Sequence, residues 1–329
     1  MKTRRFGRTG REVSEIGFGS WGIGGGQWVE VEEGEALAAL EAALDAGVTF
    51  IDTADVYGDG RSEKLIAKVL RSRGGARPFV ATKLGKRLPH QYVAGYTPEN
   101  MANWVERSRE YLETDSLDLV QLHCPPTDLF YHQEVFAALD DLVSSGKIKA
   151  YGASVERIEE GLKAMEYTGC ISLQVIFNIL RQRPIELLFE VAKKKDVAII
   201  ARVPLASGLL SGKFTMESTF EKADHRNFNR HGEAFDVGET FSGLPFEEGL
   251  KVVERIRPLL PGGATMAQFA LRWILMFDAV SVVIPGARTA AQAKSNSTAT
   301  RLAPLSPEVM AELKTIYAED VKPFVHQRW

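Results

Sequence analysis

The feature of this sequence that most restricts its fold is a regular alternation of short β-branched runs with amphipathic helical patterns. Each run is short enough for a buried strand, and the intervening segments carry apolar residues at helical spacing. About eight strands are predicted in this way, each followed by a helical pattern, which is the rhythm of a (β/α)8 TIM barrel. No low-complexity linker interrupts it, so residues 1–329 are predicted to form a single barrel domain. The predicted strands begin within 13–22, end at Asp52, and then cover 79–83, 117–123, 148–154, 171–175, 197–201 and 280–284; the predicted helices cover 32–46, a segment capped by Ser62, 97–112, 132–145, 158–165 and 185–195.

Three segments fall outside this rhythm. Residues 2–14 have the pattern of an N-terminal β-hairpin with its turn at 7–10. The spacing Gly17-x-Gly19-x-x-Gly22 matches a dinucleotide-binding fingerprint, but that fingerprint requires a helix at the third glycine, and helical periodicity begins only near Glu32. A flexible strand-to-helix loop is therefore favoured over a Rossmann loop. The interval 204–245, after the seventh strand, has little periodicity, and such a long loop is predicted to fold over the barrel mouth.

Composition narrows the class of partner. The 40 basic and 43 acidic residues are spread along the chain and give a net charge of −3, which gives no reason to expect nucleic acid or an anionic membrane. Cys124 and Cys170 have no paired spacing, so neither a disulfide framework nor a zinc site is predicted. The basic start is not followed by an apolar segment, and no run is long enough to span a membrane. A cytoplasmic protein that acts on small molecules is expected, with no metal.

Polar residues stand at the ends of three successive predicted strands. These are Asp52, Lys83 and His123, and Tyr57 follows in the loop after the first of them. Each alone has an ordinary explanation as a turn former, a solvated cation or a hydrogen-bonded core residue. Together they occupy the C-terminal rim, where active sites of TIM barrels lie, and neighbouring strands are only about 4.8 Å apart.

The chemistry suggested by these four residues is proton donation to an oxygen. A tyrosine titrates near pH ~10, and the sequence predicts that a cationic Lys83, held by Asp52, lowers that value. His123 would orient a carbonyl oxygen. The chain shows no obvious serine or cysteine nucleophile, and the first strand lacks the His-x-His pair of metal-dependent barrel hydrolases. Because a proton alone reduces nothing, a hydride donor must be bound.

The motifs around these residues resemble those of the aldo-keto reductases in order and spacing over almost the whole chain, and are most similar to bacterial members with an N-terminal hairpin. The resemblance is carried by Phe6–Gly10, Ile51–Gly58, Thr82–Lys83, Leu122–His123, Gly152–Ser154, Pro204–Lys213 and Ile284–Arg288. It implies that Tyr57 is the general acid, that Lys83 and Asp52 tune it, and that His123 directs the substrate carbonyl. The implied activity is reversible, NADPH-dependent reduction of aldehydes or ketones. The potassium-channel β subunits share this fold, so a nucleotide-binding regulatory subunit with little turnover is the alternative.

The same resemblance implies cofactor contacts. Ser154 and Gln174 match positions that hold the nicotinamide carboxamide, and Arg288 is suited to grip a 2′-phosphate, which favours NADPH over NADH; a surface salt bridge is the ordinary alternative for Arg288. The remaining implied cofactor positions are Ser20, Trp21, Arg202, Leu205, Ser207, Gly208, Leu209, Ser211, Lys213, Gly286, Gln292 and Asn296.

Two positions depart from the pattern of the family. Val155 stands where relatives commonly have an amide side chain, and Arg202 stands where many have a tyrosine under the nicotinamide ring. A cation there would repel an oxidised nicotinamide, so Arg202 is expected either to turn toward the cofactor phosphates or to favour the reduced form. The substrate and the oligomeric state are not fixed by the sequence; candidate pocket residues are Trp21, Trp28, Tyr57, Leu88, His90, Phe228 and 324–329.

Overall fold

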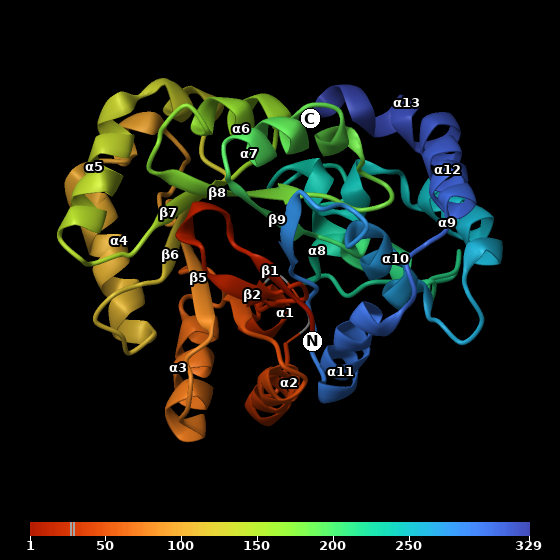
Figure 1. Cartoon of the computed structure of the whole chain (residues 1–329), viewed down its shortest axis with the longest axis horizontal. Helices are drawn as coiled ribbons and strands as arrows, with labels where there is room; N and C mark the ends of the chain where they lie inside the picture. Colours follow the sequence, from red (N-terminus) through yellow and green to blue (C-terminus); the bar gives the residue numbers. More distant parts are fainter. Residues whose placement is uncertain (27, 29) are drawn as a thin grey trace.

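The computed structural model describes every residue of the chain except 27 and 29, and its centre is a barrel of parallel strands (Figure 1). The eight barrel strands follow one another in sequence order, from β3 to β10. Parallel bridges from Ile16 to Val283 and from Gly19 to Gly286 join the first strand to the last and close the sheet. The (β/α)8 prediction is therefore confirmed. The strands are β3 (Phe18–Gly19), β4 (Phe50–Asp52), β5 (Phe79–Leu84), β6 (Leu119–His123), β7 (Tyr151–Ser154), β8 (Cys170–Ile176), β9 (Ala198–Arg202) and β10 (Val280–Val283).

Helices surround the strands because each presents an apolar face to the sheet (Figure 1). In α4, Thr97 caps the first turn by accepting from the backbone of Asn100, and Pro98 occupies the first helical position, as predicted. None of the described helices is long and apolar enough to cross a membrane. The helices of the ring are α2 (Glu33–Asp45), α3 (Arg61–Arg73), α4 (Pro98–Tyr111), α5 (Gln133–Ser144), α6 (Ile158–Ala164), α7 (Leu188–Lys194), α10 (Met266–Ile274) and α11 (Ala290–Thr298).

The predicted N-terminal hairpin is present as β1 (Thr3–Arg5) paired antiparallel with β2 (Glu12–Ser14). Phe6 between them is fully buried and packs on Phe50 and Phe79, which begin β4 and β5. The hairpin therefore covers the N-terminal end of the barrel and leaves the C-terminal rim, with its polar residues, for function.

Two local predictions were wrong. The glycine-rich stretch after β3 contains a short helix, α1 (Trp21–Gly24), where a loop was expected before Glu32; part of that loop, residues 27 and 29, lies outside the described residues. Gly19, the last residue of β3, lies where the barrel closes, and a Cβ there would lie 2.7 Å from the carbonyl oxygen of Ile284. Ser62 does not cap α3, because the helix begins at Arg61 and its N-cap is Gly60. Gly60 has a φ of 90°, a conformation that glycine adopts readily.

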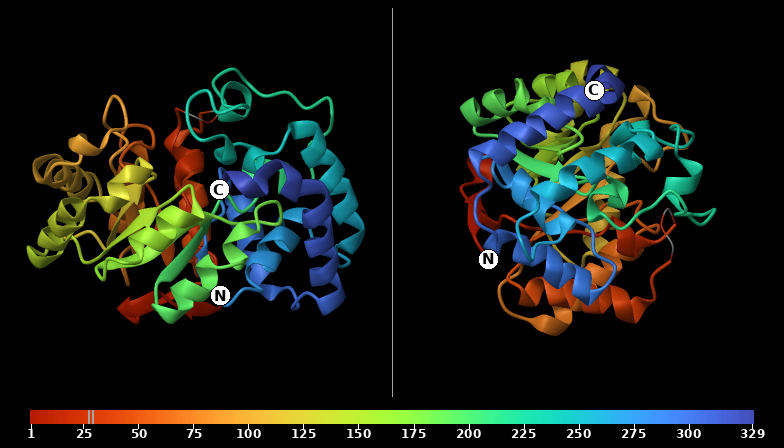
Figure 2. Two further views of the ribbon diagram at one scale, coloured as in Figure 1. Left: turned by 90° about the horizontal axis from the view of Figure 1, so that it is seen from above. Right: turned by 90° about the vertical axis from the view of Figure 1, so that its right-hand side faces the viewer.

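The long segment after β9 is mostly irregular, with one short helix, α8 (His225–Phe228), and single turns that include η5 (Ala206–Ser211) and η6 (Val237–Glu239). It forms the extended loops at the top of the left view in Figure 2. Its residues touch the rim, since Glu239 binds Arg202 and His225 packs on Trp21. The prediction that this segment folds over the barrel mouth is therefore confirmed. The chain then continues through α9 (Phe246–Ile256), and after α11 through α12 (Pro307–Ile316) and α13 (Lys322–Val325).

Candidate active site

Asp52, Lys83 and Tyr57 meet at the C-terminal rim, as the sequence predicts. Lys83, 1% exposed, donates from Nζ to Asp52 Oδ1 at 2.5 Å and to the carbonyl oxygen of Thr53 at 2.8 Å. The same Nζ donates to the Tyr57 hydroxyl oxygen at 3.2 Å. Since the phenol oxygen accepts from the ammonium, its own proton remains available to another acceptor.

Two glutamines complete the environment of Asp52. Gln174 Nε2 on β8 donates to Asp52 Oδ2 at 2.7 Å, and Gln121 Nε2 on β6 donates to the same oxygen at 3.2 Å. The buried carboxylate is thus bonded on both oxygens and paired with a buried cation. Gln121 was not predicted, although it lies two residues before His123 and so on the same strand face. Gln174, predicted to contact the cofactor, has its amide nitrogen engaged with Asp52.

The predicted lowering of the Tyr57 pKa is wrong. Burial raises the pKa of Tyr57 well above its usual value, and the Asp52 and Glu239 carboxylates raise it further, while Lys86 and Arg202 oppose them. Because Lys83 is paired with Asp52, its charge does not outweigh the effect of burial on the phenol. The tyrosine is therefore held as a neutral, protonated phenol.

His123, at the end of β6, lies beside this phenol with its ring edge-on, 5.9 Å between centroids. Burial lowers the pKa of His123 well below its usual value, and the cations Lys86, Lys83 and Arg202 lower it further. The imidazole is therefore neutral and carries one N–H donor. Nδ1 is buried and has no hydrogen-bond partner among the described residues.

The turn that carries Tyr57 is fixed by hydroxyl contacts and by close backbone packing. Ser62 Oγ contacts Ser20 Oγ at 2.7 Å and Thr53 Oγ1 at 2.8 Å, and Ser20 Oγ donates to the carbonyl oxygen of Asp52. Gly58 has φ of 61°, and a Cβ there would lie 1.8 Å from the carbonyl oxygen of Gly24. Ser20, predicted to bind the cofactor, is fully buried with its hydroxyl used inside this network.

A buried acid pair, missed by the sequence analysis, lies under the same turn. Asp55 and Glu63 are both fully buried, and neither carboxylate oxygen of Asp55 has a hydrogen-bond partner within the described structure. Burial raises the pKa of Asp55 to about 7, with a further contribution from Glu63, against the opposing charges of Arg87 and Arg107. In the sequence, the only sign that Asp55 belongs to the site is its position two residues before Tyr57.

This acid gives a testable pH dependence. Because the pKa of Asp55 is higher in the folded than in the unfolded protein, folding favours its protonated form, and its contribution to stability declines as pH rises from about 4 to about 7. Asp55→Asn is expected to raise Tm at pH ~8 and to remove this decline, which is at most about 4 kcal/mol. Thermal melts between pH ~4 and ~8 test it, with exposed Asp45→Asn as control. Equal pH profiles for wild type and Asp55→Asn would contradict it.

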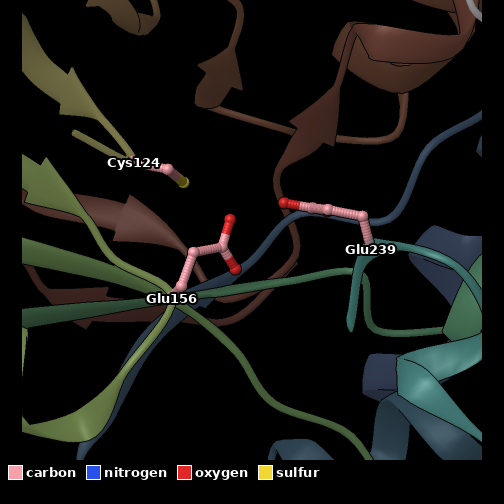
Figure 3. Close-up of side chains that lie close together, drawn as sticks. All are labelled: Cys124, Glu156 and Glu239. Atoms are coloured by element: carbon pink, nitrogen blue, oxygen red, sulfur yellow. The ribbon is translucent and has the colours of Figure 1, made fainter. Parts of the chain in front are cut away.

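Arg202 forms a charged cluster that the sequence did not predict. It is 7% exposed at the end of β9 and bonds to Glu239 of the long segment and, at 3.0 Å, to Glu156 Oε2. Its Nη2 also lies 3.6 Å from Cys124 Sγ. Figure 3 shows Cys124, Glu156 and Glu239 converging from three separate segments. The Arg202 guanidinium is therefore neither unpaired nor directed toward solvent. Two carboxylates hold it in place, an arrangement called the clamp below.

The same three side chains have donor atoms within 4.8 Å of one another, a spacing suited to a metal ion. However, the Arg202 guanidinium contacts all three of them. Burial also raises the pKa of the Cys124 thiol to about 12, so it is a neutral and weak ligand. The guanidinium is therefore the cation that this donor set holds.

Lys86 interacts electrostatically with the same side chains. Burial lowers the pKa of its ammonium, but Cys124, Glu239 and Glu156 outweigh that effect and raise it. The region therefore contains two cations and two carboxylates, and its net charge is close to zero.

The predicted carboxamide and pyrophosphate residues lie around this rim. Ser154, at the end of β7, is 3.4 Å from Cys124 Sγ through its hydroxyl, and Val155 is buried. In η5, the hydroxyl of Ser207 donates to the carbonyl oxygen of Glu239, and Ser211 donates to that of Gly208. Leu205 precedes this turn, Leu209 is buried within it, and Lys213 follows it exposed to solvent.

The predicted adenosine residues lie where β10 leads into α11. Gln292 accepts from the backbone N–H of Arg288 at 2.8 Å, and Asn296 donates to the carbonyl oxygen of Gly286 at 3.1 Å. The Arg288 side chain packs over Gly22, and its Nε has no hydrogen-bond partner among the described residues. The surface salt bridge considered for Arg288 is not formed within the described chain.

An aromatic wall adjoins the phenol. Trp21 lies roughly parallel to Tyr57 with 6.3 Å between ring centroids, and it also packs on Trp28, His225 and Phe235. His225 and Phe235 were missed because they are distant in sequence. Trp329 instead holds the long segment, donating from Nε1 to Asp236 Oδ1 at 2.9 Å.

The chain is similar to known proteins over most of its length. The family model described as "Aldo/keto reductase family" matches residues 15–318. "Aldo-keto reductase YhdN" of Bacillus subtilis (strain 168) is 31% identical over 94% of this chain and 91% of its own length. A "Probable voltage-gated potassium channel subunit beta" of Arabidopsis thaliana is 26% identical over 96% of each chain. The "aldo-keto reductase from Klebsiella pneumoniae in complex with NADPH" superposes with a TM-score of 0.69 at 25% identity, covering 96% of this chain and 95% of its own.

Proposed function

Since the chain belongs to the aldo/keto reductase family, we propose that it is an NADPH-dependent reductase of aldehydes or ketones, reversible toward alcohols. The observation that carries the proposal is the contact from Lys83 Nζ to the Tyr57 hydroxyl oxygen at 3.2 Å, beside neutral His123. This arrangement presents a protonated phenol and an imidazole donor to one oxygen atom. A carbonyl oxygen that becomes negative during reduction is the group such a site would stabilise.

The division of roles follows from the contacts. Tyr57 holds the proton at Oη, and Lys83 is hydrogen-bonded to that oxygen, where its charge would stabilise the phenolate left after proton transfer. Asp52, with Gln121 and Gln174, keeps the ammonium in place. His123 is placed to donate to the substrate oxygen. A bound nicotinamide cofactor would supply the hydride.

The residues present fit a phosphorylated cofactor. Lys213 and Arg288, on the segments after β9 and β10, form no ion pair with any described residue, so both cations are available to anionic groups. Around Ser207 (φ 54°) and Gly208 (φ 98°) the backbone is left-handed in succession, a conformation from which anion-binding turns are built. We assign Lys213 with Leu205, Ser207, Gly208, Leu209 and Ser211 to the pyrophosphate, and Arg288 with Gly286, Gln292 and Asn296 to the 2′-phosphate end. The NADPH complex of the similar Klebsiella protein supports this choice of cofactor.

Arg288 tests the choice between NADPH and NADH. Arg288→Ala is expected to weaken NADPH binding roughly 10- to 100-fold, because a charge-assisted contact to the 2′-phosphate is lost, and to leave NADH binding nearly unchanged. Binding is measured by fluorescence titration, with the exposed Arg301→Ala as a matched control. Equal losses of affinity for NADPH and NADH would show that Arg288 does not bind the 2′-phosphate.

The functional experiment is a panel of aldehydes and ketones mixed with the protein and NADPH, followed by loss of the absorbance of the reduced cofactor. Turnover of at least one carbonyl class supports the reductase. Tight binding of NADPH without turnover of any panel member would instead favour a regulatory subunit, the role that the Arabidopsis protein has by its name.

A further inference from the structure

The clamp on Arg202 brings charges from separate parts of the chain to one point. Arg202 ends β9, Glu156 follows β7, and Glu239 comes from the segment folded over the mouth. Both carboxylates bond the guanidinium, and Arg202 and Glu239 are at least nine-tenths buried. In such an environment unbalanced charge acts over several ångströms with little screening by water. The net charge of this cluster would therefore affect the binding of a charged ligand nearby.

The cluster lies close to the reacting groups, because Arg202 Nη2 is 3.6 Å from the Sγ of Cys124, the residue that directly follows His123. Its members are among the charges that act on Tyr57 and His123: after burial and Asp52, Glu239 and Arg202 act on the pKa of Tyr57, and Arg202 acts on that of His123. A cofactor that delivers hydride to a carbonyl held by Tyr57 must place its ring next to that carbonyl, and so within range of the same charges. This step depends on the proposed function.

We propose that Glu156 and Glu239 determine how the site discriminates between the oxidised and reduced cofactor, by cancelling the positive charge of Arg202 and Lys86. The oxidised nicotinamide ring is cationic and the reduced ring is neutral. With both carboxylates ionised the cluster is neutral and the oxidised ring meets no net repulsion. Without one of them, the cluster carries an excess positive charge that weakens binding of the oxidised form alone.

The arrangement also explains why an arginine is compatible with this position. An unpaired guanidinium beside an oxidised ring would disfavour it, as the sequence analysis anticipated, whereas a clamped guanidinium does not. Neither Tyr57 nor His123 hydrogen-bonds to the clamp in the described structure, so the clamp acts on these two donors through its charge alone.

The test is the ratio of dissociation constants for NADP⁺ and NADPH, measured by calorimetry or by fluorescence titration. In Glu239→Gln, and separately in Glu156→Gln, this ratio is expected to rise about tenfold relative to wild type, since one added charge acts on only one redox form. In Arg202→Gln the ratio is expected to fall, because the carboxylates then outnumber the cations. Glu166→Gln, which removes an exposed partner of Lys163 on the surface, is the matched control and should leave the ratio unchanged.

The ratio of the two dissociation constants distinguishes an electrostatic effect from damage to the fold. A loosened loop would weaken both forms together and leave the ratio where it was. Ratios within twofold of wild type in both glutamate variants would overturn the inference while leaving the proposed function standing. If the wild-type protein bound neither form, the proposed function would fail, and this inference with it.

Discussion

Tyr57→Phe is expected to lower kcat for carbonyl reduction by roughly 10²- to 10⁴-fold, the usual contribution of a positioned general acid. The substitution removes only the hydroxyl that accepts from Lys83 and leaves the ring against Trp21 and His123. NADPH binding and Tm should therefore stay close to wild type. Steady-state rates with the most active carbonyl, together with NADPH titration, provide the measurement.

A matched control for this variant is Tyr96→Phe. Tyr96 is a buried tyrosine whose hydroxyl donates to Gln91 and does not bond to the Lys83 ammonium. Its loss should change kcat little. If Tyr57→Phe retained more than about a tenth of wild-type kcat, below the range expected for a general acid, its phenol would not be the proton donor.

The second large effect is expected at Lys83, whose replacement acts on both stability and activity. Lys83→Met leaves Asp52 buried with only its two glutamine donors, and removing one member of a buried ion pair usually costs about 3–5 kcal/mol. The variant should also lose carbonyl reduction, since no cation remains beside the phenol oxygen. Denaturant melts and turnover assays measure the two effects separately.

The double variant Asp52→Asn/Lys83→Met separates stability from catalysis. Removing both charges eliminates the uncompensated carboxylate, so most of the lost stability should return while activity does not. Recovery of activity in the double variant would mean that Lys83 serves only to neutralise Asp52. Failure of stability to recover would mean that the ion pair itself contributes to folding.

Much of the fold was predictable because its signals are local. Each strand is a short apolar run, and the polar residues Asp52, Lys83 and His123 stand directly at strand ends, where barrel architecture brings them together. The grouping of these residues therefore followed from sequence order. Ser62 was misassigned because its hydroxyl could equally cap a helix or bridge Ser20 and Thr53, and only the positive φ of Gly60 decides between them.

What could not be predicted depends on contacts between distant segments and on burial. Glu239 lies far along the chain from Arg202, in a segment without periodicity, so their pairing required the loop to be placed. The pKa of Tyr57 was predicted in the wrong direction because the sequence shows that Lys83 is near but not that Asp52 offsets its charge, nor that the phenol is enclosed. The burial of Asp55 and Glu63 likewise depends on how the fold packs the segments around them.

In the proposed reaction, a hydride donor and the Tyr57 phenol act on one carbonyl group. The most direct measurement uses NADPH deuterated at the transferable position with a carbonyl that the protein turns over, and examines the alcohol produced. The expected result is deuterium on the carbinol carbon. Reduction should also be slower in D₂O than in H₂O, and this solvent isotope effect should be absent in Tyr57→Phe. NADPH that stays bound and unoxidised with every carbonyl, or an alcohol without deuterium, would contradict the claim.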